Sequence, residues 1–381
     1  MHRFDYFSRT LFDKLLSLIP TDVSYQSWYS NDILDSTDHG HNTLPDHLGR
    51  ITISAPNAVF SHSDLLDCGR EYDHDDKHFM TAGARAYLDL VDRHPDTNFI
   101  LAMSREYASR EIQHKRIQLV SFDSGMTNQQ HQYQLLRPES NKNFDSDKTF
   151  VCLNRNARQH RVNLVSYLLG RDLETFGHIS FRDDKPTDSW LERVSWTLNE
   201  QQQCDIKPYL MRGYAKIEDL QQNSLPQVDS LYNLSSFNNA TNFDILLRPL
   251  YQNYFVEIIS ETSFNQPHFG ASEKFLNSVF GYNFPIMIGG QGVVKWLGDM
   301  GFDMFHDIID HSYDNIQNPL DRLCTAIDAN MSLLTDPNKI KLLWQNNKSR
   351  FDKNVEFAKN KMYDWFWNRS VDQFQQIHWK Q

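Results

Sequence analysis

Residues 254–300 read YFVEIISETSFNQPHFGASEKFLNSVFGYNFPIMIGGQGVVKWLGDM, and this stretch shows the clearest alternation of predicted strands and helices in the chain. Its short apolar runs, 254–260 and 284–288, are typical of strands buried in a parallel sheet. A helix is predicted over 272–280, with Ser272 as its N-cap and Gly281 at its end. A second helix is predicted over 293–300. Connections this short predict a β-α-β-α unit of the Rossmann-like kind.

The same pattern recurs upstream, which predicts further α/β layers. The remaining predicted elements are strands at 51–54, 99–104, 117–123, 148–154 and 178–181 and helices at 77–91 and 156–169. A polar stretch rich in Asp, Asn and Gln, 126–147, predicts a linker. We therefore expect two Rossmann-like α/β domains that face a cleft, residues 1–147 and 148–340. We expect the C-terminal segment 341–381, an amphipathic helix with an aromatic tail, to pack back onto the N-terminal domain.

The distribution of charge limits the classes of partner. The 381 residues contain 38 Lys and Arg against 49 Asp and Glu, a formal net charge of −11 at pH 7. Residues 1–150 are the more acidic part, with 15 basic and 22 acidic residues, which disfavours an extended contact with nucleic acid or anionic lipid. In contrast, residues 151–171 contain four arginines and no acidic residue. This local excess of positive charge indicates an anion site.

The cysteines and the hydropathy pattern indicate the compartment. The four cysteines lie far apart and form no Cys-x-x-Cys pair, which argues against a disulfide framework and a structural zinc site. The first residues are interrupted by charges, unlike a signal peptide, and no apolar run is long enough to span a membrane. We expect a soluble, cytoplasmic protein, in the host cytoplasm if it is viral.

Two segments contain residues suited to bind a nucleotide. The segment 153–161 (LNRNARQHR) lies where a strand ends and a helix begins, so backbone N–H groups and arginines can bind a diphosphate there. In the second segment, Glu257 and Glu261 lie in and after a strand and suit ribose hydroxyls. Lys274 in the next helix can reach a phosphate, and a Gly-rich turn, 289–292, follows. The alternative interpretation of each residue taken alone is an ordinary charged side chain in the first turn of a helix, exposed to solvent and without a ligand.

Residues 254–323 resemble the donor-binding half of GT-B-fold glycosyltransferases. The similarity is to the S/T-E-K-x-x-x-A-x-x-x-G-x-x-P-I/V segment of the alpha-1,3-fucosyltransferase type and its phage-encoded relatives, and it falls on Ser272, Glu273, Lys274, Gly281 and Pro285. The segment 150–161 (FVCLNRNARQHR) resembles the LNR…HR segment that opens their second domain. The donor-binding residues that the motifs and the resemblance together indicate are Asn154, Arg155, Arg158, His160, Arg161, Glu257, Glu261, Ser272, Glu273, Lys274, Gly289 and Gly290.

The resemblance implies an inverting glycosyltransferase that moves a sugar from a nucleotide-diphosphate sugar to an acceptor hydroxyl without a metal or other cofactor. A carboxylate near a strand end of the N-terminal domain would act as base. Glu106 and Asp123 are the first candidates, with Asp64, Asp67 and Glu71 as further options. The acidic N-terminal domain favours a glycan or small-molecule acceptor over a modified DNA base. The oligomeric state is left open.

Two other functions stay open on the sequence. The chain could be a catalytically silent binding or assembly protein with the same scaffold. It could also be a metal-dependent hydrolase, since Asp- and His-rich stretches occur at 38–41 and 73–78. Loops of this composition are more often solvated than metal-bound, and Asp145-Ser146-Asp147 precedes its predicted strand rather than ending one. We therefore predict no metal site.

Overall fold

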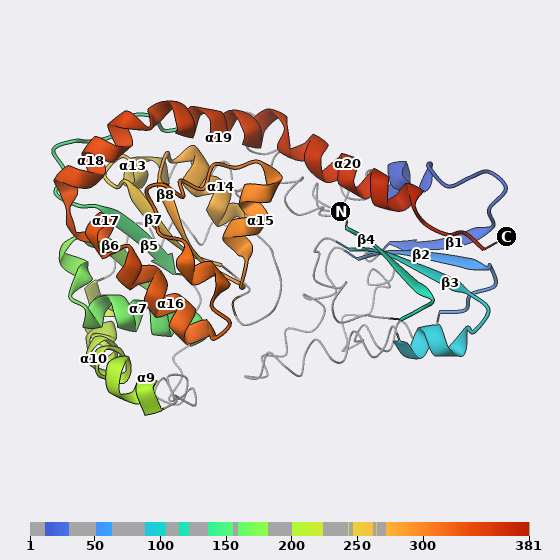
Figure 1. The fold of residues 1–381 in the computed structure, drawn as a ribbon, viewed down its shortest axis with the longest axis horizontal. Helices are drawn as coiled ribbons and strands as arrows, with labels where there is room; N and C mark the ends of the chain where they lie inside the picture. The colour runs from blue at the N-terminus through green and yellow to red at the C-terminus, as the bar shows by residue number, and fades with distance from the viewer. Residues whose placement is uncertain are drawn as a thin grey trace. The chain divides into compact units, whose positions relative to one another are not determined.

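The structure of the chain is a computed structural model (Figure 1). It describes residues 12–29, 51–62, 88–103, 114–121, 136–154, 159–181, 200–223, 243, 247–261, 264 and 272–380. The chain forms two compact units. The first combines residues 1–131 with residues 361–381, and the second comprises residues 132–360. The expected ranges 1–147, 148–340 and 341–381 stay a prediction, but the C-terminal residues clearly belong with the N-terminal sheet.

The first unit contains a four-stranded, all-parallel sheet in the order β1-β2-β3-β4. The strands are β1 (Tyr25–Tyr29), β2 (Asn57–His62), β3 (Asn98–Met103) and β4 (Ile117–Ser121). Alternate residues of neighbouring strands enter two different hydrophobic clusters: Phe60 and Leu101 pack in one, Val59 and Ile100 in the other. The sheet is therefore apolar on both faces, as expected for parallel strands.

The last helix, α20 (Met362–Gln375), covers one of these faces (Figure 1). Phe374 packs in the cluster that contains Val59 and Ile100. Beyond the helix, the N–H of Lys380 donates to the Asn57 side chain over 2.9 Å, and the N–H of His378 donates to Gln118 over 2.8 Å. These contacts confirm that the end of the C-terminal segment, from Lys361, packs back onto the N-terminal sheet, whereas residues 341–360 belong to the second unit.

The second unit contains another four-stranded parallel sheet, in the order β6-β5-β7-β8. Its strands are β5 (Phe150–Asn154), β6 (Gly177–Phe181), β7 (Val256–Ser260) and β8 (Phe284–Ile288). From β5 the chain passes first to one side of the sheet and then, at β7, to the other. The strand order therefore reverses between β5 and β7, which is where open α/β sheets bind ligands. The expected fold class, two Rossmann-like α/β units with C-terminal helices packing back, is confirmed.

Helices flank this sheet. They are α7 (Gln159–Gly170), α9 (Glu200–Asp205), α10 (Lys207–Asn223), α13 (Arg248–Tyr251), α14 (Glu273–Phe280), α15 (Val293–Met300), α16 (Pro319–Ala329), α17 (Met331–Thr335), α18 (Pro337–Asn346) and α19 (Lys348–Asn360), with the short 3-10 helices η1 (Leu173–Thr175) and η3 (Ser312–Asn315). Helix α7 packs against α10 and α16, and α14 packs against β7, β8 and α19.

Three local predictions were wrong or incomplete. The run 51–54 is not a strand; β2 begins at Asn57, where buried Ala58, Val59 and Phe60 can pack on both faces of the sheet. Strand β1 was missed, because its alternating sequence, YQSWY, is only half apolar. The expected C-terminal helix is three helices, interrupted at Asn347 and Lys361.

Candidate functional site

The candidate site lies at the carboxyl ends of β5 and β7, the edge of the second sheet where the strand order reverses. Strand β5 ends at Asn154 and β7 at Ser260, and both side chains are buried. Within the described part of the chain, Asn154 Oδ1 and Ser260 Oγ have no hydrogen-bond partner. Other buried polar atoms of the second unit, such as Ser166 Oγ, also have no partner among the described residues, so the contacts at this edge, and not these two atoms, define the site.

His160 joins the segment after β5 to the end of β7. It lies in the first turn of α7, and its Nε2 is 2.9 Å from the backbone oxygen of Glu261. Its ring stacks on Phe264, with 5.1 Å between ring centroids. Both His160 and Glu261 are buried. The His160 side chain thus ties the start of α7 to the loop that follows β7.

Glu261 continues the connection to α14. Its N–H donates to the oxygen of Ile288 over 2.9 Å, which extends the pairing of β7 with β8. Its carboxylate accepts a hydrogen bond of 3.0 Å from the N–H of Ser272, the residue that begins α14. Glu261 therefore sets the position of the helix start relative to the strand end.

Ser272 is the N-cap of α14, as the sequence predicts. Its hydroxyl accepts from the N–H of Lys274 over 3.4 Å and from the Lys274 ammonium over 3.0 Å. The same ammonium lies 3.1 Å from the Glu273 carboxylate. The Lys274 and Glu273 side chains are 25% and 33% exposed, so an incoming ligand can reach them.

The charges around α14 influence one another. Burial raises the pKa of the Glu273 carboxyl, but the Lys274 ammonium and the Arg161 guanidinium favour the charged form and bring the pKa below its usual value. Arg161, in the first turn of α7, is itself buried. The starts of α7 and α14 thus place Arg161 and Lys274 where both charges act on the Glu273 carboxylate.

Gly289 and Gly290 follow β8 at the same edge. A Cβ on Gly289 would lie 3.2 Å from Val293 and 3.6 Å from Glu261, so the turn passes close to the Glu261 side chain. Gly292 has φ of 84°, a conformation that favours glycine. The structure thus places ten of the predicted donor-binding residues: Asn154, His160, Arg161, Glu257, Glu261, Ser272, Glu273, Lys274, Gly289 and Gly290. All but Glu257 lie at the carboxyl edge.

Glu257 lies in the amino-terminal half of β7 instead. Its carboxyl accepts a hydrogen bond of 2.7 Å from the Tyr251 hydroxyl. Burial raises the pKa of Glu257 to about 8, against the opposing effects of Tyr251, Ser278 and Lys142. The residue belongs to a buried polar cluster with Tyr251 and Lys142, and the Glu261 carboxylate adds to the effect that raises its pKa.

Four of the predicted site residues fall outside the described ranges. They are the first two candidate bases, Glu106 and Asp123, and the arginines Arg155 and Arg158. The further options for the base, Asp64, Asp67 and Glu71, and the Asp- and His-rich stretches 38–41 and 73–78 also lie outside them. Among the residues that the structure describes, no group of three or more His, Cys, Asp or Glu side chains could hold a metal ion.

Sequence reasoning missed two residues that contact this edge, Asp314 and Arg322. The Asp314 carboxylate accepts hydrogen bonds from the N–H groups of Val294 and Lys295 at the start of α15. The Arg322 guanidinium donates to the backbone oxygens of Gly289 and Phe264. Neither residue belongs to a recognisable motif in the sequence, so only the fold reveals these contacts.

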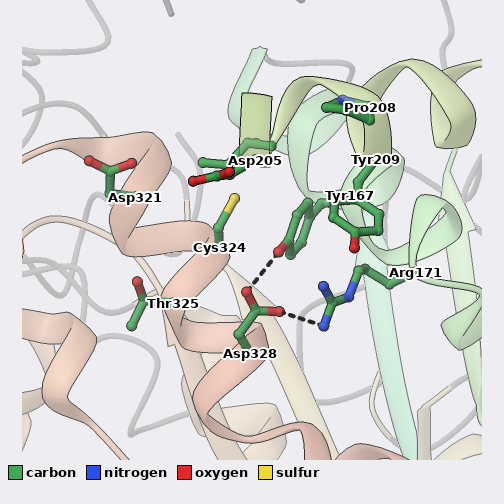
Figure 2. Close-up of a pocket in the computed structure, with 10 residues that line it drawn as sticks. Tyr167, Arg171, Asp205, Pro208, Tyr209, Asp321, Cys324, Thr325 and Asp328 are labelled. Carbon is green, nitrogen blue, oxygen red and sulfur yellow. Dashed lines mark hydrogen bonds and ion pairs between the residues drawn. The ribbon is translucent and has the colours of Figure 1, made fainter. Parts of the chain in front are cut away.

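A separate pocket of about 620 Å³ lies between α7, α9, α10 and α16 (Figure 2). On one side Tyr167 donates to Asp328 over 2.8 Å, Arg171 lies 3.1 Å from the same carboxylate, and the Arg171 guanidinium covers the Tyr209 ring. Figure 2 shows Asp205 opposite this group, across Cys324. None of the predicted donor-binding residues lines this pocket.

Comparison of the chain with protein-family models, with curated proteins and with solved structures found no match. No helix in the described ranges is long and apolar enough to cross a membrane. The fold and the carboxyl edge of the second sheet are therefore the observations on which a functional proposal rests.

Proposed function

We propose that this protein is a glycosyltransferase that transfers a sugar from a nucleotide-diphosphate sugar to an acceptor hydroxyl. The donor would bind at the carboxyl edge of the second sheet. The two parallel sheets with flanking helices are compatible with the GT-B arrangement that the sequence resembles. The acceptor would be a glycan or another small molecule, in line with the acidic composition of the N-terminal part.

One observation carries the proposal. Residues of three separate segments, His160 after β5, Glu261 after β7 and Ser272 before α14, are joined by direct hydrogen bonds where the strand order reverses. This position is the usual ligand site of open α/β sheets. The same three segments contain the motifs that resemble nucleotide-sugar-binding proteins, so the site predicted by topology coincides with the site predicted by sequence.

The side chains at this edge suit the chemistry of such a donor. Arg161 and Lys274 would balance the charge that develops on the departing diphosphate, a task for which preorganised cations are effective. The partly exposed Glu273 carboxylate could accept hydrogen bonds from ribose or sugar hydroxyls. Arg155 and Arg158 would add to the positive charge. Because these side chains supply the countercharge, we expect transfer without a metal. Glu106 and Asp123 remain the proposed bases for an inverting reaction.

A nucleotide panel tests the proposal directly. Wild-type protein is heated with UDP, GDP and their sugars at about a hundredfold excess over Kd, where one of them should stabilise the fold by about 2.7 kcal/mol. Lys274→Ala should weaken the affinity for that nucleotide at least tenfold, measured by titration calorimetry. Lys353→Ala, an exposed lysine of α19, is the matched control and should leave it unchanged.

Each outcome has a clear meaning. A wild type that responds to none of these nucleotides contradicts the proposal. Equal affinity of wild type and Lys274→Ala contradicts the placement of the donor. Binding without release of sugar to any offered acceptor or to water would favour the catalytically silent binding protein instead.

A further inference from the structure

The segment that contains η3 and the start of α16 contacts the glycine-rich turn 289–292 from several directions. The N–H of Gly292 donates to the backbone oxygen of Asp314 over 2.9 Å. The side-chain amide of Gln291 donates to the oxygen of Asn315 over 2.9 Å. Residues 314 and 315, which follow α15 in the sequence, therefore hold the turn in place.

Asp314 makes the most extensive of these contacts. Besides the bond from Gly292, its two carboxylate oxygens accept from the N–H groups of Val294 and Lys295, over 3.2 and 3.0 Å. The N–H of Val293 donates to Gly290 within the turn, over 3.2 Å. All four N–H groups from the N-cap Gly292 through Lys295, which a helix normally leaves without an intrahelical partner, are thus occupied within the protein.

A carboxylate at this position does what a bound phosphate does in other α/β proteins. It satisfies the N–H groups and places negative charge at the positive end of the helix. The turn before α15 therefore resembles a phosphate-binding turn in sequence but already holds the anion that such a turn attracts. A donor phosphate could bind there only by displacing Asp314.

Arg322 fixes the same turn from the other side. Its guanidinium donates to the backbone oxygen of Gly289 over 3.1 Å, to that of Ile316 over 2.7 Å and to that of Phe264 over 2.7 Å. It also lies over the Phe264 ring, 5.0 Å from the centroid. One buried side chain thus connects the loop after β7, the turn after β8 and the segment before α16.

These contacts reach the residues that the proposed function uses. The Phe264 ring stacks on His160, which binds the backbone oxygen of Glu261. We propose that Asp314 and Arg322 are positioning residues of the candidate site: Asp314 closes the start of α15 to phosphate, and Arg322 holds the surrounding loops in register. The donor diphosphate is thereby left to Arg161 and Lys274. This inference rests on the proposed function.

The choice of arginine has a physical reason. A guanidinium presents five N–H groups in a planar fork and can reach oxygens of three loops at once, whereas a lysine ammonium is a point charge. Arg322→Lys should therefore fail to restore the site although it keeps the charge. This expectation separates a positioning role from a purely electrostatic one.

The experiment compares Asp314→Asn, Arg322→Met and Arg322→Lys with wild type. Amide hydrogen exchange of residues 289–295 reports the turn, and titration with the nucleotide that wild type binds reports the site. We expect at least tenfold faster exchange in each variant. We also expect at least tenfold weaker nucleotide binding in both Arg322 variants, with KM for the donor raised more than kcat is lowered.

Two further variants serve as controls. Thr149→Val removes a buried hydroxyl whose acceptors are the Phe176 and Leu334 oxygens, at the opposite edge of the sheet, so it should lower stability but leave nucleotide affinity unchanged. If Arg322→Met does not fold, Gln291→Ala and Asp314→Asn still test the turn, because Gln291 is exposed and Asn has the shape of Asp.

The results distinguish the two proposals. Nucleotide affinity within twofold of wild type in the folded Arg322 variants overturns the positioning role and leaves the proposed function standing. Faster exchange with unchanged affinity also overturns it, since the contacts would then be structural only. A wild type that binds no nucleotide overturns the proposed function and the positioning role together, while the exchange data show separately whether Asp314 and Arg322 hold the turn.

Discussion

The carboxylate of Glu261, directly after β7, accepts a hydrogen bond of 3.0 Å from the backbone N–H of Ser272, which begins α14. Ten residues separate Glu261 from Ser272 in the sequence, and both were predicted to belong to the donor-binding site. The bond shows that the strand end and the next helix start form one local unit. The Glu261 side chain is buried, and Ser272 is partly buried.

Glu261→Ala should therefore lower the free energy of unfolding by about 1.5–3 kcal/mol, the usual contribution of a hydrogen bond to a charged group. Glu261→Gln should cost much less, because its side-chain oxygen can still accept from Ser272. Urea unfolding of the three proteins gives the comparison. Equal stabilities of the Ala and Gln variants would contradict the role given to this bond.

Lys142 supports a second prediction. Its buried ammonium donates to the backbone oxygens of Tyr251, Tyr254 and Gly281 and to the Asn283 side chain, over 2.6 to 2.8 Å. Lys142→Met would leave these acceptors without their donor, so we expect a loss of about 1–3 kcal/mol in the free energy of unfolding. Lys353→Met, at an exposed position of α19, should change it little. Denaturant titration of both variants checks this.

Glu257 predicts how stability depends on pH. Burial raises its pKa in the folded protein to about 8, so the folded state keeps a proton that the unfolded state releases near the ordinary value of 4.5. This contribution to stability is greatest below pH 4.5 and falls as the pH rises toward 8. Glu257→Gln should flatten the fall of Tm over this range, while Glu356→Gln, at an exposed position, should not. Parallel profiles for wild type and Glu257→Gln would contradict the assignment.

His311 predicts the opposite slope at lower pH. Burial lowers its pKa to about 4, and its ring nitrogens lie 2.7 Å from the Met304 oxygen and 3.1 Å from the Tyr313 hydroxyl. Between pH 4 and 6.5 only the unfolded state binds the proton, so stability is lost as the pH falls through this window. We expect His311→Gln to show a weaker loss than wild type. The exposed His378→Gln serves as the comparison, and thermal unfolding at several pH values measures both.

The crossing of α7 and α10 gives a prediction about packing. A Cβ on Gly213 would lie 1.7 Å from the backbone oxygen of Ser166, which no small movement relieves. Gly213→Ala should therefore destabilise the protein by about 3 kcal/mol or more. Gly298→Ala is the matched helical control: its nearest neighbour would be 3.9 Å away, and Ala should stabilise α15 by up to about 1 kcal/mol. A tolerated Gly213→Ala would show that the two helices can separate.

Much of the second unit could be predicted from local sequence. The strands and helices from β7 to α15 begin and end within two residues of their predicted limits, because Ser272 and the glycines at 281 and 292 mark helix ends by backbone chemistry alone. The strand β2 could not be placed in the same way. Both 51–54 and 57–62 contain apolar residues, and pairing with β3 selected the second.

The residues of the candidate site likewise divide into those that local sequence predicted and those that it did not. His160, Glu261 and Ser272 were found because strand ends and helix starts can be recognised in the sequence. Glu257, chosen because it interrupts an apolar strand, lies in a buried cluster with Tyr251, since a local pattern does not show what surrounds a buried side chain. Asp314 and Arg322 had no motif, and their contacts with α15 and Gly289 depend on a turn that lies more than twenty residues earlier.

The sequence by itself determined the α/β class, the limits of the elements from β7 to α15 and the residues at their ends, because these depend on interactions within a few residues. Only the tertiary structure decided the strand order β6-β5-β7-β8, the reversal between β5 and β7, and the filling of the α15 start by Asp314. The reason is physical: strand order and buried contacts depend on which distant segments pack together. Local periodicity and capping residues carry no information about that choice.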